Sequence, residues 1–169
     1  MKRLLAALTA TTALSACASA PVEPVVVATV GPATQENWEA GQAAYLAWNG
    51  ARKGWTTTAS GLQYRLEGKA APNGAQPVAT DTVRVHYQGT FIDGREFDSS
   101  YSRGEPASFP LNRVIKGWTE GVALMREGET YQFVIPADLA YGPRWVGQNI
   151  PPNSVLKFKV ELLAVNPAP

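Results

Sequence analysis

The chain has 169 residues, which suits one compact domain with an extension, and its 45% hydrophobic and 17% charged content is ordinary for a globular protein. Its 15 basic and 14 acidic residues nearly balance, so a basic face for nucleic acid is not expected. Cys17 is the only cysteine, which excludes an internal disulfide and leaves the domain without a cysteine-based metal site or nucleophile.

Residues 1–16 have the pattern of a bacterial export signal, with a short positive region, an apolar run and a lipobox-like end, Leu14-Ser15-Ala16-Cys17. The apolar run is too short to be kept as a membrane-spanning helix. The lipobox resemblance implies cleavage before Cys17 and lipidation of that residue, and several acyl chains together would anchor the chain durably. Cleavage after residues 18–20 is the alternative, and it is disfavoured because a proline would follow the cut.

Residues 17–33 form the predicted lipidated tether. The stretch after Cys17 is rich in Pro, Val and Ala, carries Glu23 as its only charge and shows neither helical nor alternating periodicity, which indicates an extended linker. Removing the signal, with Lys2 and Arg3, from the 15 basic residues leaves 13 against 14 acidic ones, a net charge of −1.

Residues 34–53 are predicted to form an amphipathic helix, because Trp38, Tyr45 and Trp48 recur at helical spacing while polar residues occupy the other faces. This aromatic stripe has two interpretations: it docks onto its own domain, or it pairs with the helix of a second molecule. About five turns are short for an extended dimerisation helix, so we expect docking and a monomer.

The remainder, residues 60–165, is predicted to be one domain built mainly of strands. Val83, Val85 and Tyr87 alternate with Arg84, His86 and Gln88, as a sheet with one wet face requires, and the same period recurs around Phe133 and Phe158. Residues 116–125 are the only compact helical candidate between these strands. Asp93-Gly94 signals a tight turn, and the Gly and Pro residues in 141–153 mark a long irregular loop that would overhang a pocket.

Five short motifs in this domain would each supply a wall or rim of a concave, apolar pocket, suited to a neutral hydrophobic peptide segment. They are Val85-His86-Tyr87-Gln88-Gly89, the run from Asp93 to Ser100, Val114-Ile115-Lys116-Gly117-Trp118, Leu139-Ala140-Tyr141-Gly142 and Ile150-Pro151-Pro152-Asn153. Their order closely resembles the FKBP-type peptidyl-prolyl cis-trans isomerases, over roughly Ser60 to Val165 and with most similarity to the bacterial Mip-like branch.

The resemblance implies an α+β fold in which a curved antiparallel sheet of about five strands wraps around one short helix, preceded here by the N-terminal amphipathic helix. It also implies the roles of the pocket residues. Trp118 would form the floor under the proline ring, with Tyr87, Phe97, Val114, Ile115 and Phe158 as walls and Ile150 closing the rim. Tyr141 would donate its hydroxyl to the substrate carbonyl, and Asp98 would hold Tyr87 in place or bias the local electrostatics.

Each assignment has a structural alternative. Taken alone, the aromatic residues are more often core packing than ligand wall, Asp98 before two serines is more often a turn or cap carboxylate, and Tyr141 can be a simple loop tyrosine. His86 is expected on the strand face opposite Tyr87, so we predict that His86→Ala keeps activity. No Gly-x-Ser-x-Gly elbow joins this histidine to a nucleophilic serine, which sets a serine hydrolase aside.

The implied reaction is rotation about X-Pro bonds, whose barrier of roughly 18–20 kcal/mol comes from amide resonance. A dry pocket that favours the twisted amide over the planar one would accelerate it without a nucleophile, metal or cofactor, so no cofactor is expected. The expected partners are proline-containing unfolded or exported proteins, a membrane through the lipid anchor and, by resemblance, FKBP-directed macrolides. The expected location is the bacterial cell envelope, facing the periplasm or exterior. The alternative is a non-catalytic chaperone or scaffold module that uses the same pocket.

Two positions depart from the family pattern: Ala107 stands where an aromatic wall residue often sits, and Val146 where the overhanging loop often has histidine. A pocket more open on that side is expected. Trp145 is an unusual aromatic on the same loop, and we hypothesise that it contacts extended client peptides.

Overall fold

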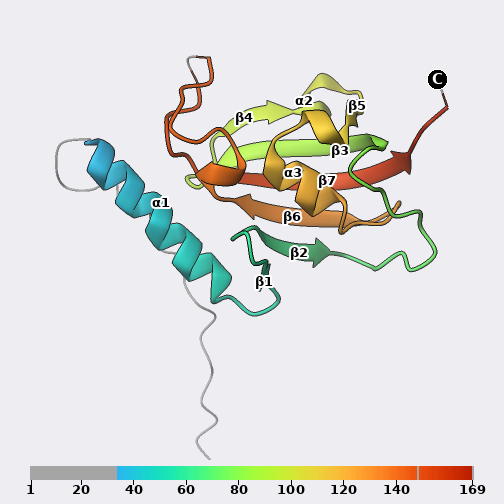
Figure 1. The fold of residues 1–169 in the computed structure, drawn as a ribbon, viewed down its shortest axis with the longest axis horizontal. Coiled ribbons are helices and arrows are strands. Elements are labelled where there is room, and N and C mark those ends of the chain that lie inside the picture. The colour runs from blue at the N-terminus through green and yellow to red at the C-terminus, as the bar shows by residue number, and fades with distance from the viewer. Residues whose placement is uncertain (1–33, 148, 169) are drawn as a thin grey trace, which may run out of the picture.

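A computed structural model describes residues 34–147 and 149–168. The predicted signal at 1–16 and the tether at 17–33, including Cys17, lie outside the described residues. Within the described part, no helix combines the length and the apolar character needed to cross a membrane. Figure 1 shows one curved sheet with a short helix against its face and a longer helix beside it.

Seven antiparallel strands form the sheet, in the order β1-β2-β6-β7-β3-β4, with β5 pairing the remaining part of β3. The strands are β1 (Thr56–Thr57), β2 (Gln63–Glu67), β3 (Thr82–Phe91), β4 (Glu96–Ser99), β5 (Ala107–Pro110), β6 (Thr130–Ile135) and β7 (Leu156–Val165). The curved antiparallel sheet predicted from the sequence is therefore confirmed. It has more than the expected five strands, because β1, β4 and β5 are too short to show a period-two pattern.

One edge of β3 is shared by two short partners. Its first half pairs with β5, its second half pairs with β4, and the short helix α2 (Ser100–Arg103) lies in the connection between them. The other edge of β3 pairs with β7 along nearly its whole length. The alternation of buried and more exposed residues along β3, and along β7 as far as Leu163, places one face of each strand in the core.

The short helix α3 (Lys116–Val122) packs against the concave face of the sheet, as the sequence predicts. Gly117 and Gly121 allow this close approach, because a Cβ atom at these positions would lie 2.5 Å from Ile135 Cγ2 and 2.7 Å from Phe133 Cε1 on β6. The regular helix ends three residues before Met125, which is nevertheless fully buried because its N–H donates back to Val122 in a turn. Two 3-10 turns, η1 (Leu111–Arg113) and η2 (Ala137–Leu139), complete the elements on this side.

The N-terminal helix α1 (Gln35–Gly50) begins at Thr34, whose side chain caps it by accepting from the Asn37 N–H at 3.2 Å. Its Tyr45 packs with Val134 and Val155 on the side of the sheet opposite α3. Hydrogen bonds that tie the helix to the domain include Trp38 Nε1 to the Pro152 carbonyl at 3.1 Å, the Val155 N–H to Gln42 Oε1 at 2.9 Å, and Asn49 Nδ2 to Gln63 Oε1 at 2.9 Å. The helix docks onto its own domain, the first of the two interpretations that the sequence allows.

Candidate active site

The concave side of the sheet contains a cavity of about 320 Å³ between β3, β4, α3 and the loop after η2. Its lining residues are Tyr87, Phe97, Asp98, Phe109, Arg113, Val114, Ile115, Trp118, Tyr141 and Phe158. The structure thus brings together eight of the nine substrate-contacting residues proposed from the sequence. The exception is Ile150, which is buried in the main hydrophobic cluster.

The backbone of its loop holds Ile150 in place. The Val146 N–H donates to the Ile150 carbonyl at 3.1 Å, and the two residues form an isolated β-bridge. The side chain of Ile150 packs in the main hydrophobic cluster and is only 7% exposed. That Ile150 closes the rim of the cavity stays a prediction.

The floor of the cavity is the indole ring of Trp118, which α3 holds against the sheet. The rings of Tyr87, Phe109 and Phe158 meet it edge-on, with centroids 5.3, 5.7 and 5.4 Å away. Phe97 in turn meets Phe158 edge-on at 5.6 Å. Perpendicular aromatic pairs at these distances are favourable, so the rings hold one another in place and leave an apolar cup of fixed shape.

Gly89 on β3 makes room for two of these rings. A Cβ atom at Gly89 would lie 2.7 Å from Phe97 Cζ and 2.9 Å from Phe158 Cε1, closer than real side chains approach. The absent side chain therefore lets Phe97 and Phe158 lie directly over β3. This packing fixes the width of the cavity on that side.

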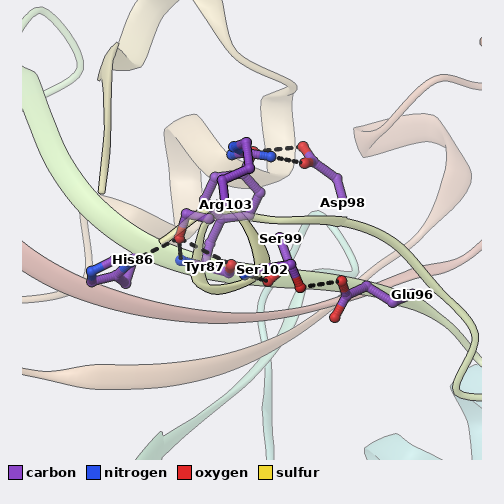
Figure 2. Close-up of polar contacts among 8 residues, drawn as sticks. His86, Tyr87, Glu96, Asp98, Ser99, Ser102 and Arg103 are labelled. Atoms are coloured by element: carbon purple, nitrogen blue, oxygen red, sulfur yellow. Dashed lines mark hydrogen bonds and ion pairs between the residues drawn. The ribbon is translucent and has the colours of Figure 1, made fainter. Parts of the chain in front are cut away.

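One polar network lies on the lip of the apolar cup (Figure 2). The Tyr87 hydroxyl donates to Asp98 Oδ2 at 2.5 Å, Arg103 Nη2 donates to the Tyr87 oxygen at 2.8 Å, and Arg103 Nη1 forms an ion pair with Asp98 Oδ1. The guanidinium of Arg103 also lies over the Tyr87 ring, 5.4 Å from its centroid. Asp98 is therefore the partner of Tyr87, as one of the sequence-based expectations has it, and Arg103 fixes both.

These contacts set the protonation states at neutral pH. Partial burial disfavours ionisation of Asp98, but donation by Tyr87 and Arg103 together with the charge of Arg103 outweighs burial and lowers the pKa of Asp98. Burial, reinforced by the hydrogen bond to Asp98, raises the pKa of Tyr87. Burial and the charge of Asp98 raise the pKa of Tyr141 in the same way. Asp98 is thus a carboxylate, and both tyrosines keep their protons.

The Tyr141 hydroxyl differs from that of Tyr87 in having no hydrogen-bond partner among the described residues. Tyr87 is fully engaged by Asp98 and Arg103. Tyr141 lines the cavity, holds its proton and is free to donate it to an acceptor that enters. The cavity therefore combines an apolar cup with the available hydroxyl of Tyr141.

No sequence pattern indicated three residues of the site, which are Arg103, Phe109 and Arg113. Arg103 reaches the site because α2 starts at Ser99, whose Oγ accepts from the Ser102 N–H at 3.2 Å, and ends at Gly104 in the left-handed conformation. Phe109 follows Ala107 at the strand period on β5 and supplies an aromatic wall on the side where the sequence predicts an open pocket. No sequence pattern marked Phe109, because the four residues of β5 are too few to show a strand period.

His86 lies on the face of β3 opposite Tyr87. Its ring stacks on Tyr101 at 4.7 Å, and its Nδ1 lies 3.0 Å from Ser100 Oγ. Ser100 is fully buried, and its hydroxyl also accepts from the Tyr87 N–H at 2.7 Å and donates to the Tyr87 carbonyl at 3.2 Å. The Ser100 hydroxyl thus joins α2 to the backbone of β3, and its contact with His86 is structural and not that of a hydrolytic pair. No group of three or more His, Cys, Asp and Glu side chains positioned to hold a metal ion occurs in the described part of the chain.

Comparisons with known proteins agree with this geometry. A model of the family "FKBP-type peptidyl-prolyl cis-trans isomerase" matches residues 73–163. The chain is 55% identical over 130 residues to an FKBP-type peptidyl-prolyl cis-trans isomerase FkpA of Aeromonas hydrophila, covering 77% of this chain and 47% of that one. It is 47% identical over 134 residues to the outer membrane protein MIP of Legionella longbeachae, covering 79% and 56%.

Among solved structures, a peptidyl-prolyl cis-trans isomerase from Pseudomonas syringae superposes with a TM-score of 0.73 at 33% identity, covering 81% of this chain and 99% of that one. FkpA from Escherichia coli superposes with a TM-score of 0.72 at 49% identity, covering 78% and 60%. The chain spans about half the length of the curated relatives that it matches.

Proposed function

Because the chain belongs to the FKBP-type peptidyl-prolyl cis-trans isomerases, we propose that its aromatic cavity accelerates rotation about X-Pro bonds in unfolded or exported proteins. The observation that carries this proposal is the cup around Trp118 with the available hydroxyl of Tyr141 at its wall. A proline ring is small and apolar enough to enter the cup. The amide that precedes the ring would then lie near that hydroxyl.

The chemistry follows from what an amide loses when it twists. The planar amide is polar and well hydrated, whereas the twisted amide has lost its resonance and much of its charge separation. A cup that excludes water disfavours the planar form more than the twisted form, and only such a difference in binding lowers the barrier. The fixed rings around Trp118 supply that environment without reorganising during the reaction.

The polar residues have separate roles in this proposal. Tyr141 donates to the substrate carbonyl next to the rotating bond and holds the peptide in register. Asp98 and Arg103 keep the Tyr87 ring and hydroxyl in one orientation, and the carboxylate biases the field near the rotating carbonyl. Ile115 and Val114 line the wall at the start of α3 and contact the residue that precedes proline.

The proposal predicts a specific loss when the Tyr141 hydroxyl is removed. A neutral hydrogen bond contributes about 1 kcal/mol, so Tyr141→Phe should lower kcat/KM on a proline tetrapeptide by roughly five- to tenfold. The matched control is Tyr131→Phe, because Tyr131 stacks on Phe133 outside the cavity and loses the same hydroxyl. Equal turnover in both variants would contradict the proposed role of Tyr141.

A binding module that holds proline-containing segments without catalysis is the second candidate, because it would use the same cavity. The two are separated by measuring tetrapeptide turnover and suppression of aggregation of an unfolded protein on the same sample. An isomerase accelerates the first, whereas a pure binder suppresses aggregation and leaves the tetrapeptide at its spontaneous rate. Macrolides directed at this family should compete for the cavity, which isothermal titration measures.

We also propose a lipid anchor at Cys17, which places the domain on the bacterial cell envelope facing the periplasm or exterior. Support comes from the lipobox-like sequence and from the similarity to a protein named for the outer membrane. Cys17→Ser should release the protein from the membrane fraction and abolish incorporation of labelled fatty acid. Unchanged fractionation would contradict the anchor.

We further propose that the mature protein is a monomer, because the aromatic side of α1 is occupied by its own sheet. Light scattering after size-exclusion chromatography tests this. A dimer whose mass is independent of concentration would contradict it.

A further inference from the structure

A second cavity, of about 370 Å³, lies on the opposite side of the sheet from Trp118, under the C-terminal half of α1 and the segment that follows it. Strand register builds its floor from one row of outward-facing residues on four adjacent strands: Arg65 pairs with Gln132, Gln132 with Lys159, and Lys159 with Gln88. The next row adds Lys157 and Thr90. Tyr45, Arg52 and Trp55 form the roof.

The charge of this cavity is one-sided. Four basic side chains line it, Arg52, Arg65, Lys157 and Lys159, and no carboxylate does. Lys159 is paired with Glu67 at 3.0 Å, just beyond the lining. Glu67 also attracts Arg65, although the two form no direct ion pair, and Arg52 and Lys157 make no ion pair among the described residues. At neutral pH the cavity therefore concentrates positive charge on a protein whose overall charge is close to zero.

Aromatic rings hold three of these cations in place. The guanidinium of Arg65 lies 5.3 Å from the centroid of the Trp55 ring, and that of Arg52 lies 4.5 Å from the Trp48 ring. The ammonium of Lys157 lies 5.7 Å from the Tyr45 ring. Cation–π contacts of this kind orient a charge without neutralising it. The cations are thus positioned before any ligand arrives.

Hydrogen-bond donors also exceed acceptors around the cavity. The Gln132 oxygen accepts from Arg65 at 2.9 Å, and its amide nitrogen donates to Glu67 at 2.8 Å. The buried Nε of Arg65 and Nε1 of Trp55 have no acceptor among the described residues. A wall with surplus donors and unpaired cations is complementary to oxygen atoms that carry negative charge.

We propose that this cavity binds a small anion with two or more phosphate or carboxylate groups. Arg52 and Arg65 can each present two parallel N–H groups to such a group, whereas Lys157 adds a point charge. The volume is within the range of small-molecule sites. The isomerase chemistry does not use these residues, because Lys157 and Lys159 leave β7 on the face opposite the aromatic cup.

The test is titration calorimetry at low ionic strength with tripolyphosphate and, separately, with citrate. The variant combines Arg65→Gln with Lys157→Gln, and the matched control combines Lys69→Gln with Arg84→Gln. Both pairs remove two positive charges, but Lys69 and Arg84 are exposed and do not line the cavity. We expect Kd for the preferred anion to rise at least tenfold in the first pair and less than twofold in the control.

The preferred probe identifies the chemistry, phosphate or carboxylate. Tetrapeptide turnover should be unchanged in both pairs, so failure of this inference is distinguishable from failure of the proposed isomerase activity. If Arg65→Gln impairs folding, Lys157→Gln alone should still weaken binding at least threefold. The proposal is overturned if neither probe binds, or if the control pair weakens binding as much as the cavity pair.

Discussion

Replacing Gly89 with alanine should narrow the aromatic cup on the side formed by β3. The new Cβ would lie 2.7 and 2.8 Å from two atoms of the Phe97 ring and 2.9 Å from Phe158 Cε1. Carbon atoms in favourable contact lie about 3.5–4.0 Å apart, so both rings must move by roughly 0.7–1 Å. Since β3 blocks the other direction, the rings move into the space where the proline ring would bind.

The expected cost comes from overpacking. Insertion of a methyl group into a well-packed core typically costs about 1–3 kcal/mol, and at about 4 °C per kcal/mol for a domain of this size Tm should fall by about 4–12 °C. The displaced rings should also lower kcat/KM on a proline tetrapeptide by about tenfold, which corresponds to about 1.4 kcal/mol in the barrier. Both are measured on the same preparation, at a temperature where the variant is fully folded.

Gly41→Ala is the matched control, because it makes the same chemical change in a different setting. Nothing lies within 4 Å of a Cβ at Gly41, and the residue is inside helix α1. Alanine there should stabilise the protein by about 0.5–1 kcal/mol and leave turnover unchanged. Full activity of Gly89→Ala, with the expected loss of stability, would refute the idea that Phe97 and Phe158 shape the substrate site.

Three further predictions concern the lip, the helix and the loop. The pKa of Asp98 is lowered in the folded state, so the stability that Asp98 contributes should be present above pH ~4, the ordinary aspartate range, and lost as pH falls below it. The free energies of unfolding of wild type and Asp98→Asn, measured with denaturant from pH 2 to 7, should converge only at the acid end. A difference that stays constant with pH would contradict the network. Gln42→Ala leaves the buried Val155 N–H without an acceptor and should lower the free energy of unfolding by about 1–3 kcal/mol, as urea unfolding would measure. The exposed control Gln35→Ala should lower it by less than about 0.5 kcal/mol. Equal effects of the two substitutions would argue against the docked helix. Trp145 is 62% exposed, so Trp145→Ala should slow catalysed refolding of a proline-limited protein at least twofold and leave Tm unchanged, and unaltered refolding and peptide turnover would exclude a client contact.

The face of each long strand could be predicted from the sequence because its pattern repeats over many residues. Alternation along β3 placed Tyr87 and His86 on opposite faces, and the structure has them so. The short strands were not predictable in this way, since two to four residues contain no measurable period. The irregular loop shows a different limit, because no local sequence pattern records the backbone bridge between Val146 and Ile150.

Polar contacts between residues far apart in the chain could not be predicted from the sequence either. Most aromatic members of the site lie in the five motifs, but Arg103 reaches Asp98 and Tyr87 only because α2 turns the chain back over β3. The same holds for the basic cavity: sheet register brings Arg65 of β2 together with Lys157 and Lys159 of β7, and Arg52 comes from the turn after α1. An exposed lysine or arginine looks alike in sequence whether its neighbours in space are acids or other cations.

The central claim is that the cup around Trp118 accelerates prolyl rotation, and exchange NMR on an Ala-Leu-Pro-Phe peptide with increasing macrolide tests it most directly. Cis–trans exchange should run well above the spontaneous rate and fall in proportion to the fraction of cavities that the macrolide occupies. Exchange that stays at the spontaneous rate with folded protein, or that persists when every cavity is filled, would contradict it.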